Sequence, residues 1–367
     1  MDDMNWNRRA FLAAAAAAPV GASTAASVMP TTTRAWQVGQ AGDFDTLQLV
    51  DRQLPPPGPG EVAIDVSASA IAGRDLAIAR GWFLENKSPE LIPLSEGVGR
   101  ITAVGDGVTR VKVGDRVVSA HFARWVSGPW SPDNYVADVG NTIDGWLAQH
   151  IVLPESGIAV VPAELTDATA ATLAGSGVTV WHALYEVAQL KSSDIVLSLG
   201  TGGVSSWGVL LAKAAGATVV VTSSSDAKLE RMKALGADIA INYRTNPSWG
   251  EEVMAKTGTG ATIVLENVGR RTLDQSMLAC DNNAMIVMIG TGRLPEQLPK
   301  MPGLYIKNLA MKAISNGSRS MLEDMMRGVA ASDIQAVVEK TFDFDDAVQA
   351  FELMARSSHI GKIVLNH

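Results

Sequence analysis

Cysteine is almost absent from this chain of 367 residues, which contains only Cys280. A single cysteine excludes an intramolecular disulfide and a cysteine-rich zinc site. It belongs to a helix-like stretch beginning at Thr272, and we interpret it as a small buried apolar residue. The alternative is a nucleophile, for which no histidine stands nearby in the sequence.

Basic residues are not in excess: 30 Lys and Arg face 38 Asp and Glu, and the two signs are interspersed. A net charge of -8 argues against a nucleic-acid-binding protein, which normally carries a basic stripe. The sequence has no long polar tract, so it does not resemble a disordered chain. It also has no apolar run long enough to span a membrane.

Apolar residues are abundant, at 47% of the chain, which is enough for a large core and for more than one compact unit. The 34 glycines often stand next to short runs of Val, Ile and Leu. This pattern is typical of an α/β protein with tight turns between strands and helices.

The N-terminus has the features of an export signal. Arg8 and Arg9 precede Phe11 and Leu12, and an alanine run over 13–18 follows. A paired arginine, a short apolar stretch and small residues predict twin-arginine export to the periplasm. The alternative is translation from Met29, with a cytoplasmic protein. In both cases residues 1–30 stand outside the predicted fold.

Two patterns follow each other along the rest of the chain. Residues 31–162 are rich in short alternating strands, for example 61–68 and 97–105. From Asp194 onward, apolar strands alternate with helix-like stretches: 195–199, 204–215, 218–222, 227–235, 239–242, 249–256, 262–266 and 285–289. This alternation predicts a doubly wound parallel sheet over 163–317. The tail, residues 342–367, is predicted as a helix followed by a strand at 363–365. It is expected to return to the first unit, so that 318–367 joins 31–162.

A glycine-rich loop connects the first of these apolar strands to a helix. Gly200 allows the tight turn, and Gly202 lets the backbone approach a pyrophosphate. The amides of Gly203 and Val204, at the start of the helix, then meet the negative charge. Ser205 replaces the usual third glycine and is still small. The placement of the loop within a βαβ unit predicts a dinucleotide site.

The end of the second strand bears on the choice of cofactor. Ser223 and Ser224 occupy the place where NAD-preferring sites usually have an acidic residue, and Lys228 follows one turn later. We therefore predict NADP(H) in preference to NAD(H). The alternative for Lys228 is a solvated surface lysine, and Asp226 is interpreted as the N-cap of the next helix.

From about Arg34 onward, the chain resembles the medium-chain dehydrogenase/reductase superfamily, in its zinc-independent quinone oxidoreductase-like and alcohol dehydrogenase-like branch. The resemblance lies in segments 97–105, 113–117, 177–184, 200–205, 234–238, 241–244 and 361–365. It implies a GroES-like catalytic domain over 31–162 and 318–367 and a Rossmann nucleotide-binding domain over 163–317. It also implies a homodimer that pairs through edge strand 309–313, for which an ordinary buried strand is the alternative.

The resemblance also bears on zinc. The positions that match the catalytic ligands of zinc-dependent relatives are Ala72, Ser95 and Gly175, none of which is a normal zinc ligand. The acidic neighbour of the second ligand is kept as Glu96. We therefore predict no zinc. The alternative is a new site built from separate histidines: His121, His150 or His182.

Further cofactor residues are implied by the same resemblance. Thr179 is expected near the nicotinamide, Lys362 near the pyrophosphate and Tyr243 beside a 2′-phosphate. Three residues at strand ends are expected to line the cofactor crevice: Asn267, Gly290 and Thr291.

Catalytic residues are harder to assign. Relatives often have Asn-Tyr-Arg-Asp where this chain has Ala-Gly-Arg-Asp, at residues 72–75. The usual polar candidates, Asn and Tyr, are therefore missing, while Arg74 and Asp75 remain. They are interpreted as a structural ion pair, with Arg74 as the alternative polariser of a substrate oxygen. His121 is a candidate general acid or a buried structural histidine.

Trp125 and Trp130 are expected either to wall an apolar substrate pocket or to fasten their loop to the core. The function predicted is hydride transfer between a nicotinamide and a small quinone, enone, aldehyde or alcohol. The alternatives are a nucleotide-binding protein that has lost turnover and an exported protein with trapped NADP(H).

Overall fold

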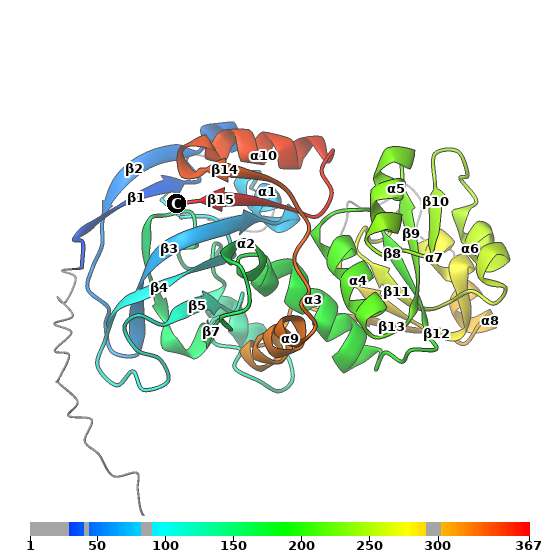
Figure 1. Cartoon of the computed structure of the whole chain (residues 1–367), viewed down its shortest axis with the longest axis horizontal. Coiled ribbons are helices and arrows are strands. Elements are labelled where there is room, and N and C mark those ends of the chain that lie inside the picture. Colours follow the sequence, from blue (N-terminus) through cyan, green and yellow to red (C-terminus); the bar gives the residue numbers. More distant parts are fainter. Residues whose placement is uncertain (1–28, 40–43, 82–89, 291–301) are drawn as a thin grey trace, which may run out of the picture.

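Two sheets build most of the molecule. The computed structural model describes residues 29–39, 44–81, 90–290 and 302–367. In Figure 1 the blue-to-cyan part of the chain and the red C-terminal segment form one lobe, and the green-to-yellow middle forms the other. The predicted export signal, except for its last two residues, lies outside the described residues, and so does Thr291.

The first lobe contains a seven-stranded sheet in which strands from both ends of the chain meet. Its strands are β3 (Glu61–Ile71), β4 (Glu96–Val104), β5 (Arg116–Ser119), β6 (His150–Pro154), β7 (Ile158–Val160), β14 (Val338–Asp343) and β15 (Lys362–Asn366). Ile363 pairs with Ile71, so the last strand extends the sheet beside β3. A hairpin of β1 (Thr32–Gln37) and β2 (Gln48–Gln53) lies beside this sheet.

The second lobe is built on a six-stranded parallel sheet, in the order β10-β9-β8-β11-β12-β13. The strands are β8 (Ile195–Leu199), β9 (Thr218–Ser223), β10 (Ile239–Asn242), β11 (Ala261–Glu266), β12 (Cys280–Met288) and β13 (Ala310–Ala313). In chain order this is 3-2-1-4-5-6, the arrangement of dinucleotide-binding sheets. The predicted α/β fold class, a GroES-like unit with a Rossmann unit, is confirmed.

Helices cover both sheets. Those of the second lobe are α4 (Gly203–Ala214), α5 (Asp226–Ala234), α6 (Trp249–Thr257), α7 (Leu273–Ala279) and α8 (Pro302–Ile306). Those packed with the first lobe or between the lobes are α1 (Gly73–Ala79), α2 (Asp167–Ala170), α3 (Val178–Trp181), α9 (Arg319–Ala331) and α10 (Ala347–Arg356). Among the described residues no helix is both long and apolar enough to cross a membrane.

One apolar core joins the two lobes. Two π-helical turns, η4 (Leu173–Gly177) and η5 (His182–Val187), flank α3 and make a nearly continuous buried segment. Val178 packs in the same cluster as Met325 of α9 and Trp207 of α4. The segment therefore sits against both lobes, although the domain boundaries expected from the sequence stay predictions.

Three local expectations need correction. Cys280 does not continue a helix: it begins β12, where burial raises the pKa of its thiol to about 12. The N-cap of α5 is Ser225, since its hydroxyl accepts from the Lys228 amide, while Asp226 accepts from Asn242. The predicted tail is also preceded by a strand, β14, which overlaps its first two residues. This strand was missed because Val338–Asp343 is half exposed and carries little apolar signal.

Candidate active site

The glycine-rich loop has the geometry that an anion site needs. Gly200 has a φ of +82°, which side-chain-bearing residues rarely adopt. A Cβ on Gly203 would lie 2.6 Å from the stem of Lys362 and from the Ser176 hydroxyl, so only glycine fits there. Ser205 donates to the Leu199 carbonyl and fastens the loop to β8. Helix α4 starts at this point, and its first amides are available to a negative group.

A cavity of about 340 Å³ opens beside this loop, at the carboxyl ends of the parallel strands. Its lining residues are Leu199, Gly200, Thr222, Tyr243, Trp249, Val268, Arg271 and Thr272. Of the residues predicted to recognise a 2′-phosphate, Tyr243 lines this cavity and Ser223 is buried at the end of β9. The Lys228 ammonium donates to the Ser357 carbonyl at 2.7 Å, so it reaches the segment after α10.

A larger cavity of about 580 Å³ lies between the lobes and shares Val268 and Arg271 with the first. The catalytic lobe lines it with α1 and its N-cap, the residue before β4 and the segment after β5: Ala72, Gly73, Arg74, Ala77, Ser95, His121, Phe122, Tyr135 and Asp138. The remaining lining comes from the connecting helix and the nucleotide lobe: Gly175, Ser176, Thr179, Val204, Asn267, Ile289, Gly290, Ile314, Ser315 and Asn316.

Arg74 is the cationic group of this cavity on the catalytic side. One terminal nitrogen donates to Asp138 at 3.0 Å, and the other lies 3.4 Å from Nδ1 of His121. Asp138 also accepts from Asn141 at 2.9 Å. Burial raises the pKa of Asp138, although Arg74 opposes that change. The expected Arg74–Asp75 ion pair is therefore wrong, because the guanidinium turns to a carboxylate 64 residues further along the chain.

His121 is a buried neutral ring in this arrangement. Burial and the nearby guanidinium of Arg74 hold its pKa well below the usual range. Because a guanidinium cannot accept, Nδ1 is the acceptor and the proton is on Nε2. Nε2 lies 3.2 Å from Asp138, without an aligned hydrogen bond. The ring therefore supports Arg74, and its predicted role as a general acid receives no help from its electrostatics.

Asp75 is turned away from the cavity and completes the start of α1. Its carboxylate accepts from the Ala72 amide at 2.7 Å, and the Ser95 hydroxyl lies 3.5 Å from its other oxygen. Complete burial raises its pKa from 3.8 to about 6, although Arg74 opposes this. This carboxyl therefore holds the backbone from which Arg74 projects.

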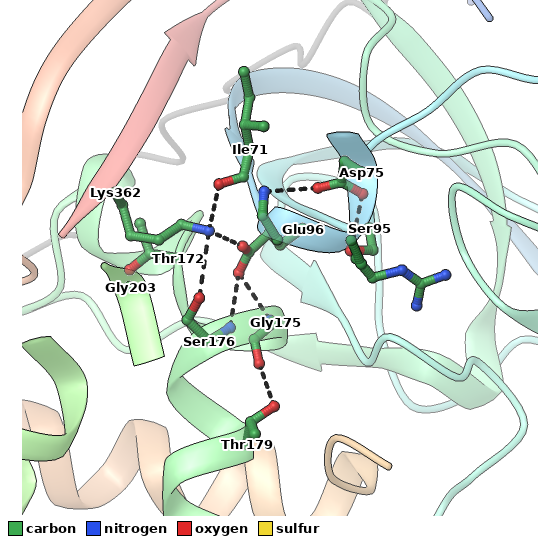
Figure 2. A network of polar contacts seen from close by, with 12 residues as sticks. Ile71, Asp75, Ser95, Glu96, Thr172, Gly175, Ser176, Thr179, Gly203 and Lys362 are labelled. Atoms are coloured by element: carbon green, nitrogen blue, oxygen red, sulfur yellow. Dashed lines mark hydrogen bonds and ion pairs between the residues drawn. The ribbon is translucent and has the colours of Figure 1, made fainter. Parts of the chain in front are cut away.

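A buried ion pair joins the parts of the site. Figure 2 shows the ammonium of Lys362 between Glu96, the Ile71 carbonyl and the Ser176 hydroxyl. The other oxygen of Glu96 accepts from the Gly175 amide at 2.8 Å. Burial raises the pKa of Glu96, and the Lys362 ammonium opposes that rise. The predicted pyrophosphate contact of Lys362 stays a prediction, and three other partners already engage its ammonium group.

Thr179 has a fixed hydroxyl. It donates to the Gly175 carbonyl at 2.7 Å and lies 3.2 Å from the amide nitrogen of Asn316, which also donates to that carbonyl. Asn316 has a φ of +60°, and the carbonyl of this residue contacts Nδ1 of His182. The residue predicted beside the nicotinamide thus lines the cavity in a set orientation.

The two tryptophans stand one layer behind the cavity wall. Trp130 packs on Phe122 and Tyr135, with ring centroids 4.6 and 5.4 Å apart. Trp125 packs on Trp130, and its indole donates to the Gly128 carbonyl. The aromatic side chains at the cavity surface are Phe122 and Tyr135, so the predicted apolar wall exists but is made by their neighbours.

The side chains present do not fit a catalytic zinc ion. Ala72, Ser95 and Gly175 do converge on the larger cavity, but they offer a single hydroxyl between them. A Cβ at position 175 would lie 2.7 Å from the Glu96 carboxylate, which occupies the space of a ligand side chain there. Over residues 29–39, 44–81, 90–290 and 302–367, no three His, Cys, Asp or Glu side chains group to hold a metal.

The alternative histidine site is not assembled either. His121 lies with Arg74 and Asp138, His150 faces Asp65 at 3.2 Å, and His182 contacts the Asn316 carbonyl. The three rings therefore have separate partners on separate elements.

A dinucleotide does fit the residues present. Asn267 donates to the Ser205 hydroxyl at 3.0 Å, while its Oδ1 is buried without a hydrogen-bond partner among the described residues. An amide-bearing ligand in the cavity would satisfy this oxygen. A Cβ on Gly290 would lie 2.1 Å from the Asn267 carbonyl, so glycine is needed beside it. Thr291, predicted for the same crevice, lies outside the described residues.

Family comparisons agree with this geometry. Residues 58–163 match the alcohol dehydrogenase GroES-like domain, and residues 203–331 match the zinc-binding dehydrogenase domain. A zinc-type alcohol dehydrogenase-like protein of Schizosaccharomyces pombe is 37% identical over 332 residues, which cover 88% of this chain and 95% of that protein.

Two solved structures share the fold. A protein of Sinorhizobium meliloti 1021 described as an alcohol dehydrogenase has a TM-score of 0.86 at 34% identity, covering 93% of this chain and all of that one. An NAD-dependent alcohol dehydrogenase has a TM-score of 0.83 at 28% identity, covering 91% and 99%.

The fold and the site thus define an oxidoreductase that uses a nicotinamide cofactor. The chain belongs to the medium-chain dehydrogenase/reductase superfamily, in its quinone oxidoreductase-like and alcohol dehydrogenase-like branch.

Proposed function

We propose that the protein transfers hydride between NADP(H) and a small carbonyl compound or alcohol without zinc. The observation that carries this proposal is the larger cavity at the junction of the lobes, which Arg74, Thr179 and Val204 all line. A ligand that spans both cavities would place its reactive end there. Quinones, enones, aldehydes and the corresponding alcohols all fit the proposal.

The chemistry divides between cofactor and protein. When bound, the nicotinamide supplies the hydride. The chain's task is to stabilise negative charge on the substrate oxygen, and Arg74 can donate to it from a position fixed by Asp138. Phe122, only 3% exposed, gives that end of the cavity an apolar wall, which strengthens the interaction with the guanidinium.

The preference for NADP(H) rests on the end of β9. Ser223 and Ser224 leave no carboxylate to repel a 2′-phosphate, while Lys228 and Tyr243 stand close to that strand end. On this basis Lys228→Ala raises the Kd for NADPH more than the Kd for NADH. Equal losses for the two cofactors would remove Lys228 from the recognition of the 2′-phosphate.

We also propose a homodimer and export through the twin-arginine route. Support for the dimer comes from β13, the outer strand of its sheet, and from Tyr305 and Ile306 beside it, which are 80% and 81% exposed.

The proposal of export rests on Arg8 and Arg9. Replacing both with lysine should hold the full-length protein in the cytoplasm of its native host. Equal periplasmic amounts of both proteins would contradict this.

The proposed reaction is tested with protein that starts at Met29. Fluorescence titration gives the Kd for NADPH and NADH, and a panel of quinones, enones, aldehydes and alcohols is followed at the nicotinamide absorbance band. Metal content is measured on the same sample. Tight binding and turnover in metal-free protein are expected, and Arg74→Met should lower kcat without a matching rise in the Kd for NADPH.

Two outcomes would overturn the proposal. Turnover that requires stoichiometric zinc would contradict the assignment of Ala72, Ser95 and Gly175 as non-ligands. Binding without turnover of any substrate would instead identify a nucleotide-binding protein that has lost its chemistry.

A further inference from the structure

The segment between α10 and β15 is attached to the nucleotide loop. The Gly361 amide donates to the Thr201 carbonyl at 2.8 Å, and Gly202 and Gly361 form a parallel bridge. On the other side of the segment, Lys228 donates to the Ser357 carbonyl. Residues 357–361 of the catalytic lobe are therefore held directly against the anion-binding end of the nucleotide lobe.

His359 lies in the middle of this segment, with its ring beside the Leu353 backbone. Only 9% of the residue is exposed, and Nδ1 is buried without a hydrogen-bond partner among the described residues. A Cβ built on Gly202 would lie 4.0 Å from Nε2. A buried imidazole is thus aimed at the glycine loop from the lobe that does not contain it.

Lys362, the cation that the sequence predicts for this loop, already has other partners for its ammonium group. The three donors of the Lys362 ammonium are directed to Ile71, Glu96 and Ser176. Helix α4 contributes its positive N-terminal end. A diphosphate held there would still have oxygens directed at the catalytic lobe, and His359 is the buried polar group that this lobe brings to Gly202.

We propose that His359 binds the pyrophosphate of the cofactor, with Nε2 donating a hydrogen bond to a phosphate oxygen at the start of α4. The inference rests on the proposed binding of a nicotinamide dinucleotide and adds a ligand from the catalytic lobe. In this proposal the bridge between Gly202 and Gly361 fixes the distance between the His359 ring and the glycine loop.

Charged groups surround the ring on several elements. Lys228 of α5 and Lys362 of β15 are nearby, and Glu339 of β14 accepts from the Ile360 amide and pairs with Arg231. Burial and the two lysines lower the pKa of His359, while Glu339 and the Leu353 backbone oppose that change. The ring is therefore neutral at pH 7 in the free protein. A neutral imidazole carries one N–H and can donate it, so the contact does not require protonation.

The test compares His359→Leu with His359→Gln, whose amide can donate from near the position of Nε2. Calorimetry gives the Kd for NADPH, NADH and ADP-ribose, which all contain the pyrophosphate. We expect the leucine variant to bind all three about tenfold more weakly or worse, as for a lost hydrogen bond to a charged group. The glutamine variant should recover a large part of the affinity.

His150→Leu is the matched control, since His150 lies on β6 and faces Asp65 at the surface. Thermal midpoints of all variants show that each is folded, and the glutamine variant keeps the comparison valid if leucine destabilises the protein. Affinities of the leucine variant within twofold of wild type would overturn the proposal. A loss confined to NADPH would also overturn it, by moving the contact to the 2′-phosphate.

The ADP-ribose measurement separates this inference from the proposed reaction. ADP-ribose lacks the nicotinamide, so its binding does not depend on turnover. A wild-type protein that reduces no carbonyl compound but binds ADP-ribose through His359 would refute the reaction and support the inference.

Discussion

Asp138 is the carboxylate that holds Arg74 in place at the polar end of the cavity. Its two oxygens face Arg74, Asn141 and His121, and the residue is 1% exposed. It acts on a substrate through Arg74 and is therefore a positioning residue. Its charge keeps the guanidinium in place, since a charged donor is held firmly by a buried carboxylate.

We predict that Asp138→Asn lowers kcat/KM by about tenfold or more, because a displaced catalytic group loses orientation. The Kd for NADPH should stay near the wild-type value. Steady-state kinetics and fluorescence titration provide the two readouts. Asp345→Asn is the control, since its pair with Arg34 is exposed. Weaker binding of NADPH together with an unchanged kcat would show that Asp138 does not act through Arg74.

Asp75 gives the protein a characteristic pH dependence. Its pKa is about 6 in the folded chain against 3.8 for the ordinary group. Between these values the folded state holds a proton that the unfolded state has released. Stability therefore falls as pH rises from about 4 to 6, by about 3 kcal/mol for this group, and the loss is complete above the folded pKa.

Asp75→Asn should remove this pH-dependent loss of stability, because an amide does not titrate. Its oxygen can still accept from the Ala72 amide. Urea unfolding of both proteins between pH 4 and 7 measures the effect. We expect the stability of wild type relative to the variant to decrease across this window. Parallel curves would show that Asp75 does not carry a raised pKa.

At the scale of elements, the Glu96–Lys362 pair joins β4 to β15 and both to the η4 turn. Removing one partner of a buried ion pair leaves the other charge unpaired. Glu96→Gln and Lys362→Met should therefore each lower the free energy of unfolding by about 3–5 kcal/mol. The double variant should recover part of that loss. Urea unfolding of the four proteins gives the coupling energy.

Lys213→Met is the control for this cycle, since the Lys213–Asp238 pair is partly exposed and should contribute less than about 1 kcal/mol. Additive losses in the double variant would mean that Glu96 and Lys362 are not coupled.

Features that depend on neighbouring residues were predicted well from the sequence. The β–α alternation and the glycine loop are read within single units, and β10 begins and ends as expected. The contacts that the sequence did not predict are made by long-range pairing: Asp138 reaches Arg74 across 64 positions, and Lys362 reaches Glu96 across 266. Asn316 and His359 carry no motif of their own. Their positions depend on the packing of the lobes, which no local pattern encodes.

At the scale of the whole molecule, the exposed apolar pair beside β13 is expected to be covered by a second copy. Ile306→Lys should then shift the mass measured by light scattering from dimer to monomer, because it places a charge in an apolar contact. Val113→Lys, at a residue 55% exposed elsewhere, is the control. An Ile306 variant that remains a dimer would remove this surface from the interface.

The pairing of Ile71 with Ile363 has a consequence for how the protein is made. A ribosome completes β3 nearly three hundred residues before it completes β15, one of the strands that pair with β3. The parallel sheet of β8 to β13 contains none of the strands that follow β13 and can collapse first. During synthesis one side of β3 stays open over Ala68–Ile71. The chain therefore has a long interval in which chaperones, or another strand edge, compete with β15 for the same backbone groups.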